Sequence, residues 1–183
     1  MSSTTGKNII DKEHYPTPVH SVEALLAQLV LRPTDTFLEP CRGEHRRIFD
    51  RVALPTDQKN WAELSEGVDY LNIDFGKHDV IITNPPFSLT EEFLSKSMSE
   101  LASDGTLVYL QRVNYLGAIK RVPFWTKLGF PEKLSILVPR PKFNPNSKHS
   151  DSCEYAWFIW DKGNRFPNMA KGLSHSISGH ILK

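Results

Sequence analysis

The sequence has few of the features that mark secreted, membrane-spanning or metal-binding proteins. Its two cysteines, Cys41 and Cys153, are far apart and match neither a disulfide framework nor a zinc-ligand spacing. No apolar run approaches the roughly 20 residues that a membrane-spanning helix needs, and the first residues contain no secretory hydrophobic segment. The seven histidines show no ligand spacing, so we predict no metal site. These absences favour a reducing, cytoplasmic setting.

An excess of charge of either sign is also missing. The chain has 22 Lys and Arg against 21 Asp and Glu, a net charge of +1, which gives no sign of strong non-specific attraction to nucleic acid. A basic groove balanced by an acidic face is compatible with this total. The length of 183 residues suits one compact domain. We expect a flexible N-terminal arm at 1–14, one domain at 15–163 and a C-terminal tail at 164–183.

Apolar spacing and turn residues predict alternating helices and strands. Apolar residues recur at helical spacing over 22–30, with Thr17 placed to cap this helix and Pro18 at its first position. Two further helices are predicted to begin at the basic stretch 45–49 and at a Ser88–Glu91 capping-box pattern. Short apolar runs bounded by turn residues predict strands at 36–40, 60–64, 79–83, 106–110, 134–138 and 155–160. This order predicts an α/β fold with a mainly parallel sheet, an antiparallel edge strand and helices on both faces.

The tetrapeptide Asn84-Pro85-Pro86-Phe87 follows the clearest of these strands. Ligands of open α/β sheets bind at the carboxyl ends of the strands, where this loop would lie. The chemistry that it fits is methylation of an aromatic amine, which is a poor nucleophile because its lone pair is delocalised into the ring. The Asn84 side-chain oxygen and the Pro85 carbonyl could hold the two amine hydrogens and aim the lone pair at a methyl donor.

The rest of the tetrapeptide suits the same chemistry. Both prolines fix φ near about −65° and lack an N–H, which stiffens the loop. Phe87 offers a stacking face for a base taken out of a duplex. No strong base is required, and alignment of the reacting atoms can supply roughly 7–11 kcal/mol. The alternative interpretation is that the tetrapeptide is only a rigid turn after a strand.

Three motifs in this order resemble those of the amino-methyltransferase family, and specifically the small phage-type DNA adenine methyltransferases. Asn84 to Phe87 match the catalytic loop, Tyr15 to Pro18 match an upstream Tyr-Pro-Thr-Pro element, and Leu38-Glu39-Pro40 with Gly43 match the cofactor loop. The resemblance covers nearly all of residues 14–163. It implies a Rossmann-like class I methyltransferase fold and methyl transfer from adenosylmethionine to the amino group of adenine in DNA, in the host cytoplasm if the chain is phage-encoded.

The resemblance also implies roles for individual residues. Glu63 would accept hydrogen bonds from the ribose hydroxyls of the cofactor, although a plain surface carboxylate is the alternative. Asp69 and Tyr70 would hold the cofactor adenine, with Asp74-Phe75 as the rival pair. The implied catalytic residues are Asn84, Pro85, Pro86 and Phe87. The implied cofactor-binding residues are Tyr15, Thr17, Glu39, Pro40, Cys41, Gly43, Glu63, Asp69, Tyr70 and Asn84.

One segment departs from the family pattern. The cofactor loop usually has a second small residue or glycine shortly after the first, whereas Gly43 is followed by Glu44-His45-Arg46-Arg47. These bulky side chains could crowd the cofactor, so a degenerate cofactor site is one of the alternatives.

Basic residues that could contact nucleic acid occur in three clusters, because phosphate binding rewards clustered charge through counterion release. For any single cluster a solvated basic loop is an equal alternative. Phe143 or Tyr115 could act as a wedge or a stacking residue, whereas Trp157 and Trp160 fit strand packing. The candidates for nucleic-acid binding are Arg42, Lys120, Arg121, Arg140, Lys142 and Lys148.

Two rival functions stay open. The acceptor could be another amine, in RNA adenine, cytosine or a protein glutamine, or the chain could be a non-catalytic nucleic-acid binder with a decayed cofactor site. The sequence has no evident separate target-recognition domain, so we expect short or relaxed specificity, read by the late loop or by a partner subunit. A homodimer is the alternative to a partner subunit.

Overall fold

The computed structural model describes residues 16–143, 150–170 and 172–177; the expected arm at 1–14, Tyr15 and Lys148 lie outside them. Seven strands form one sheet in the order β2-β1-β3-β4-β6-β5-β7. Their bounds are β1 Phe37–Glu39, β2 Lys59–Trp61, β3 His78–Thr83, β4 Leu101–Arg112, β5 Lys133–Val138, β6 Tyr155–Asp161 and β7 Gly172–Ile177.

Three α-helices and several short 3-10 turns connect the strands. The helices are α1 Val19–Leu26, α2 Thr90–Glu100 and α3 Val122–Leu128. The 3-10 turns lie at Phe49–Arg51, Thr56–Gln58, Leu64–Glu66, Tyr70–Asn72, Phe87–Leu89, Val113–Gly117 and Ile119–Arg121.

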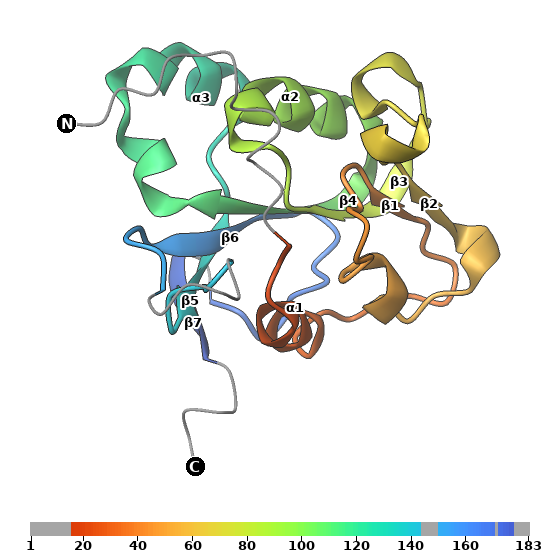
Figure 1. Cartoon of the computed structure of the whole chain (residues 1–183), viewed down its shortest axis with the longest axis horizontal. Coiled ribbons are helices and arrows are strands. Elements are labelled where there is room, and N and C mark those ends of the chain that lie inside the picture. Colours follow the sequence, from red (N-terminus) through yellow and green to blue (C-terminus); the bar gives the residue numbers. More distant parts are fainter. Residues whose placement is uncertain (1–15, 144–149, 171, 178–183) are drawn as a thin grey trace.

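The helices cover both faces of the sheet, with α2 and α3 on one side and α1 on the other (Figure 1). Alternation along the buried strands produces this arrangement, because successive side chains point to opposite faces. In β3, Val80 and Ile82 pack in the core that includes α1, whereas Ile81 packs in the core that includes α2 and α3. The central strands are therefore apolar on both faces, as a sheet covered on both sides requires.

Strand direction agrees with a Rossmann-like sheet. β1, β2, β3 and β4 are parallel, and β6 pairs antiparallel with both β4 and β5. The predicted α/β fold with a mainly parallel sheet is confirmed. The antiparallel strand β6 does not form the edge, however, because it lies between β4 and β5, and β7 extends the sheet beyond β5.

Two helix starts differ from the sequence predictions. No helix begins at 45–49, because Arg46 adopts a left-handed conformation with φ of 48° and only the Phe49–Arg51 3-10 turn follows. Ser88 does not cap α2: the Leu89 N–H bonds the Pro86 carbonyl, so a 3-10 turn carries the chain into the helix with Ser88 inside it.

The cap predicted for the first helix is also different. Pro18, not Thr17, occupies the N-cap of α1, and no side chain caps this helix. The Thr17 side chain instead makes a long-range contact within the site described below.

Part of the predicted C-terminal tail belongs to the folded sheet. Arg165 and Phe166 are fully buried, and β7 adds the seventh strand. The Arg165 Nε donates to Asp35 Oδ2 at 2.8 Å, and Lys133 Nζ donates to Asp161 Oδ2 at 2.6 Å. These ion pairs fix the segment that follows β6 against the end of the sheet opposite the site. The polar sequence of this segment predicted a tail because it does not show these long-range ion pairs.

Candidate functional site

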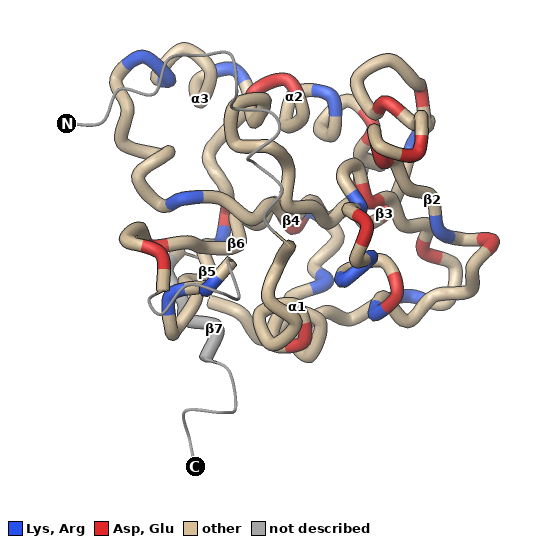
Figure 2. Tube along the Cα trace, in the orientation of Figure 1, with Lys and Arg blue, Asp and Glu red and all other residues tan. Residues whose placement is uncertain are grey.

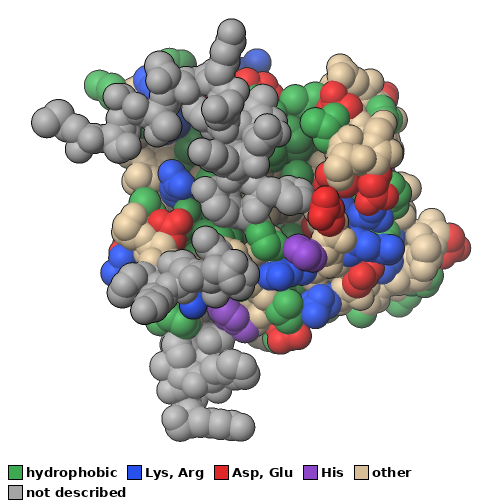
Figure 3. All heavy atoms as spheres, viewed as in Figure 1, with side chains coloured by type: hydrophobic (Ala, Val, Ile, Leu, Met, Phe, Trp, Pro, Cys, Tyr) green, Lys and Arg blue, Asp and Glu red, His purple; other side chains and the backbone are tan. Residues whose placement is uncertain are grey.

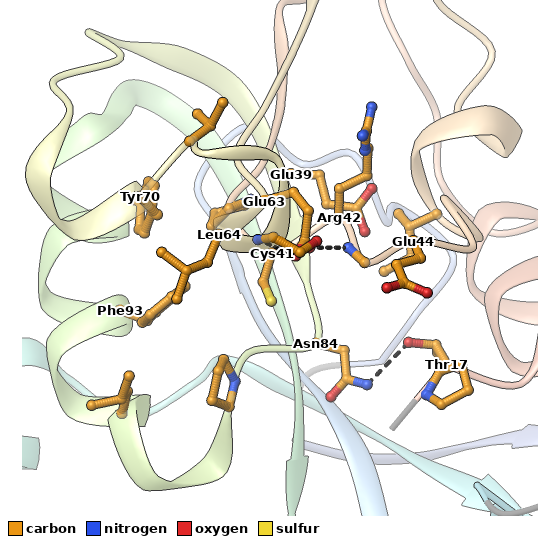
Figure 4. A pocket seen from close by; sticks show the side chains of 18 of the residues that line it. Thr17, Glu39, Cys41, Arg42, Glu44, Glu63, Leu64, Tyr70, Asn84 and Phe93 are labelled. Carbon is orange, nitrogen blue, oxygen red and sulfur yellow. Dashed lines mark hydrogen bonds between the residues drawn. The ribbon is translucent and has the colours of Figure 1, made fainter. Parts of the chain in front are cut away.

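A cavity of about 440 Å³ lies at the carboxyl ends of the first three parallel strands. Its wall includes Glu39 at the end of β1, Glu63 after β2 and Asn84 after β3, three residues that the sequence analysis placed at strand ends. Figure 4 shows these side chains on one side of the cavity and Tyr70 and Phe93 on the opposite side. The volume is in the range of small-molecule sites, about 300–1,000 Å³.

Asn84 is oriented by a residue far away in sequence. Its Nδ2 donates to the Thr17 Oγ1 at 3.1 Å, which joins the loop after β3 to the segment before α1 (Figure 4). Pro85 is buried and Pro86 lies in the cavity wall. The side-chain oxygen of Asn84 is thus the amide atom that can accept a hydrogen from a ligand.

Glu63 links the loop after β1 to the segment after β2. Its Oε2 accepts from the Gly43 N–H at 2.8 Å, and its Oε1 accepts from the Ser65 N–H and hydroxyl at 3.1 and 2.7 Å. Gly43 has φ of 66°, a conformation that favours glycine, although a Cβ there would meet no atom within 4 Å. The glycine is therefore required by its backbone conformation rather than by lack of space.

Glu39 is the most deeply buried charged group of the cavity. Its side chain is 1% exposed, and its Oε2 makes no hydrogen bond with any residue that the structure describes. Burial raises the pKa of Glu39 well above its usual range. Burial likewise raises the pKa of the neighbouring Cys41 thiol to about 12, which makes it a poor nucleophile at neutral pH.

The wall opposite Glu39 is mainly apolar and was only partly predicted. Tyr70 is buried, its hydroxyl lies 2.9 Å from the Ser97 hydroxyl, and its ring packs 5.1 Å from that of Phe93. Asp69 lies in the cavity wall, whereas its rival Asp74 is exposed outside it. Phe93 was not predicted, because its helical spacing on α2 marks it only as a core residue.

The bulky segment after Gly43 does not fill the cavity. Glu44 and His45 are exposed at its rim, and Arg47 Nη1 donates to the Thr17 carbonyl at 2.9 Å. The left-handed Arg46 turns the chain away, and its side chain pairs with Asp50.

Phe87 lies outside the cavity wall, on the side of the loop toward β4 and β6. Its ring centroid is 5.8 Å from that of Tyr155 and 5.1 Å from the Arg112 guanidinium carbon. Arg112 was missed by the sequence analysis, because a single arginine at a strand end carries no local pattern.

The residues predicted to contact nucleic acid do not form one cluster. Arg42 is buried against the Trp61 ring at 3.6 Å and pairs with Glu66, so its guanidinium is turned away from a surface ligand. Arg121 pairs with Glu91 at 3.3 Å, and Arg140 pairs with Glu154 at 3.6 Å. Lys120 and Lys142 are exposed.

Charge of both signs is spread over the molecule. Figure 2 shows basic and acidic residues on both sides of the sheet, and Figure 3 shows them next to one another on the face that it views. Among the residues that the structure describes, no group of three or more His, Cys, Asp and Glu could hold a metal ion. None of the helices within the described ranges is long and apolar enough to span a membrane.

No protein-family model and no curated protein matches the sequence. Solved structures do share the fold. A putative class I S-adenosylmethionine-dependent methyltransferase from Listeria monocytogenes has a TM-score of 0.60 at 16% identity, over 91% of this chain and 66% of that one. A modification subunit of a putative type I restriction enzyme from Vibrio vulnificus has a TM-score of 0.60 at 15% identity, over 81% of this chain and 44% of that one.

A third similar structure has a different name. Precorrin-6y C5,15-methyltransferase from Geobacter metallireducens has a TM-score of 0.56 at 14% identity, over 87% of this chain and 93% of that one. The chain thus spans about two thirds of the Listeria protein and less than half of the Vibrio subunit. Since these proteins differ in name, the fold does not fix the acceptor. The likeness shows that this chain has the Rossmann-like fold of class I methyltransferases.

Proposed function

We propose that the chain is a small phage-type methyltransferase that transfers a methyl group from adenosylmethionine to the exocyclic amino group of adenine in DNA. The observation that carries this proposal is the Asn84 side chain at the end of β3, oriented by Thr17 at the wall of the strand-end cavity. The fold of class I methyltransferases is consistent with it.

The donor set of the cavity fits adenosylmethionine. Its cationic sulfur and amino group suit a wall that contains the carboxyl groups of Glu63 and Glu39, the latter with a buried Oε2 that bonds none of the described residues. Its ribose hydroxyls suit the Glu63 carboxylate, which the Gly43 and Ser65 N–H groups hold in place. Its adenine suits the apolar side formed by Tyr70 and Phe93. When bound, the cofactor supplies an electrophilic methyl group on a positively charged sulfur.

The Asn84 loop would act on the acceptor. The Asn84 oxygen and the Pro85 carbonyl accept the two amine hydrogens, which draws the nitrogen lone pair out of the ring and toward the methyl carbon. With a methyl donor bound, these two acceptors would hold the amine in line with the donated methyl group, and the methylated nitrogen would release its extra proton to solvent. Proline at 85 and 86 limits movement of these acceptors, so positioning rather than a basic side chain supplies the rate enhancement.

Phe87 has a less direct part than the sequence predicted. Because its ring packs on Tyr155 and Arg112, it supports the acceptor side of the loop, and a base would stack on it only at the ring surface that these residues leave accessible. Base stacking by Phe87 therefore stays a prediction.

DNA as the acceptor is supported by the likeness to a restriction-enzyme modification subunit. We include in the proposal a cytoplasmic location and recognition of the DNA sequence through a partner subunit, a second copy or the late loop.

The test is transfer of labelled methyl groups to unmethylated DNA, RNA and protein in parallel, followed by mass spectrometry of the products. We expect methyladenine from DNA with the wild-type protein and none with Asn84→Ala, while titration calorimetry shows that adenosylmethionine still binds this variant. Asn168→Ala, an exposed asparagine after β6, is the matched control. Label only in RNA or protein would change the acceptor, and DNA binding without cofactor binding would establish the decayed-site alternative.

A further inference from the structure

Arg112 lies on the acceptor side of the Asn84 loop and has no role in the site described above. It is the last residue of β4, whose neighbour β3 runs parallel to it with Thr83 paired to Tyr109. The carboxyl ends of both strands therefore lie on the same side of the sheet, the side that holds the Asn84 loop. The Arg112 guanidinium carbon is 5.1 Å from the Phe87 ring centroid, which places it beside the loop that carries Asn84.

The guanidinium is held at one atom only. Arg112 Nε donates to the Tyr155 hydroxyl at 3.0 Å, and this hydroxyl donates to Asp151 Oδ2 at 2.9 Å. Within the described residues, Arg112 forms no ion pair, and its two terminal NH₂ groups donate no hydrogen bond. The Phe87 and Tyr155 rings pack near the planar group at 5.1 and 5.9 Å. The side chain is half-buried, so a preoriented cation presents its outer donors beside the acceptor loop.

The chemistry of this arrangement selects an oxyanion. A guanidinium is always charged and presents parallel donors that match two oxygens of a phosphate, whereas a lysine would offer a single point charge. Fixing the group on aromatic rings lowers the entropy lost when a ligand binds. A nucleotide in a strand carries a phosphate on each side, whereas the amide of a protein glutamine has no anion attached.

We propose that Arg112 binds a backbone phosphate next to the acceptor nucleotide and so holds that nucleotide against the Asn84 loop. This inference rests on the proposed function, because it takes the acceptor to be part of a nucleic acid. Arg112 acts here as a substrate-binding residue on the opposite side of the loop from the cofactor cavity.

The first test measures oligonucleotide affinity as a function of salt, using a fluorescent adenine-containing oligonucleotide in single-stranded and duplex form. With Arg112→Gln we expect about a tenfold to hundredfold weaker affinity, the effect of losing a charged hydrogen bond. The slope of log affinity against log salt should fall by about 0.7–0.9, the value for one phosphate contact. Arg112→Lys should keep most of the slope, because the charge remains, but bind more weakly than wild type.

Lys162→Ala is the matched control, since it also removes one positive charge. Lys162 is exposed and follows Asp161, which pairs with Thr106 at the opposite edge of the sheet. Its slope should equal that of the wild type. A merely structural role of Arg112 would lower affinity or thermal stability without changing the number of counterions released, so an unchanged slope in Arg112→Gln overturns the proposal.

A second test changes the oligonucleotide and compares the wild type with Arg112→Gln. The phosphates beside the adenine are replaced one at a time with neutral methylphosphonates. At one position the replacement should weaken oligonucleotide binding by the wild type, whereas the affinity of Arg112→Gln should not change. Equal effects in both proteins would exclude the contact. Methyl transfer measured on the same samples separates the two proposals. If the methylphosphonate effect depends on Arg112 but no methyl group is transferred, only the methyltransferase assignment is refuted. If methyl groups are transferred but the effect does not depend on Arg112, only the Arg112 site is refuted.

Discussion

The side-chain amide of Asn84 and the hydroxyl of Thr17 lie 3.1 Å apart, although 67 residues separate them in the sequence. Asn84 follows β3, whereas Thr17 precedes α1, so this bond closes the cavity wall between two segments that no strand pairing joins. It also decides which atom of the Asn84 amide faces Thr17 and which can accept a hydrogen.

Replacing Thr17 with valine tests this contact. Valine keeps the shape but cannot accept from Asn84 Nδ2, so the amide should lose its fixed orientation. The loss of one neutral hydrogen bond, about 1 kcal/mol, predicts a fall of about fivefold in methyl-transfer kcat. The control is Thr126→Val on the exposed side of α3. An unchanged kcat in Thr17→Val would show that the loop orients Asn84 without it.

Gly43→Ala tests the backbone of the cofactor loop. The substitution meets no atom within 4 Å, but it forces alanine to φ of 66°, which costs about 1–2 kcal/mol. We expect that loss in urea unfolding, together with weaker adenosylmethionine binding. Gly117→Ala, also in open space but without a positive φ, should be neutral or stabilising. Equal effects of the two substitutions would remove the conformational explanation.

Glu39→Gln tests the cost of the buried acid. Because burial raises the pKa of Glu39 above its ordinary value of 4.5, the folded protein binds this proton more tightly than the unfolded chain does. The stability that Glu39 contributes is thus complete below about pH 4.5 and is lost as pH rises through the folded pKa. Glutamine does not titrate, so the melting temperature of the variant minus that of the wild type should increase as pH increases.

At a pH above the folded pKa of Glu39, where the wild-type cavity carries a negative charge that glutamine lacks, the same variant should bind adenosylmethionine more weakly; below that pKa the two proteins should bind it alike. Glu92→Gln, on the exposed side of α2, is the control and should show no gain that grows with pH. A difference between Glu39→Gln and wild type that is constant across pH would mean that Glu39 is not the titrating group.

Arg165→Met tests the ion pair at the far end of the sheet. Arg165 and Asp35 are 1% and 2% exposed, so removing the cation leaves a buried carboxylate unpaired, at a cost of about 3–5 kcal/mol. Arg46→Met breaks the exposed pair with Asp50 and should cost under about 1 kcal/mol. Urea unfolding distinguishes them, and the double change Asp35→Asn with Arg165→Met should recover part of the loss. Similar small costs for Arg165→Met and Arg46→Met would contradict the buried pair's role.

The strand ends of the site were predictable because their signals are local. Short apolar runs stop at Glu39 and before Asn84, and parallel strands bring such ends to the same side of the sheet. The missing helix at 45–49 was not predictable, because helical composition does not reveal that Arg46 has a positive φ. The Thr17 cap was wrong for a different reason: the hydroxyl bonds Asn84, and only tertiary structure brings the two together.

Residues outside the motifs were missed because their partners lie on other strands. Arg112 becomes a candidate only when β6 places Tyr155 beside it and the loop after β3 places Phe87 near its guanidinium. The segment after 164 is polar in sequence, yet Arg165 is buried because Asp35, more than a hundred residues earlier, neutralises it. Polarity alone therefore cannot define where this domain ends.

The reversed direction of β6 has a consequence for how this fold can change. Because β5 ends and β6 begins at the edge that holds the cavity, the connection 139–154 must start and finish beside the site. Residues can be added to or removed from this connection without shifting the register of either strand. The sheet thus separates two kinds of evolutionary change: substitutions in the parallel half act on the packing that shapes the cavity, whereas changes of length in the connection leave that packing intact.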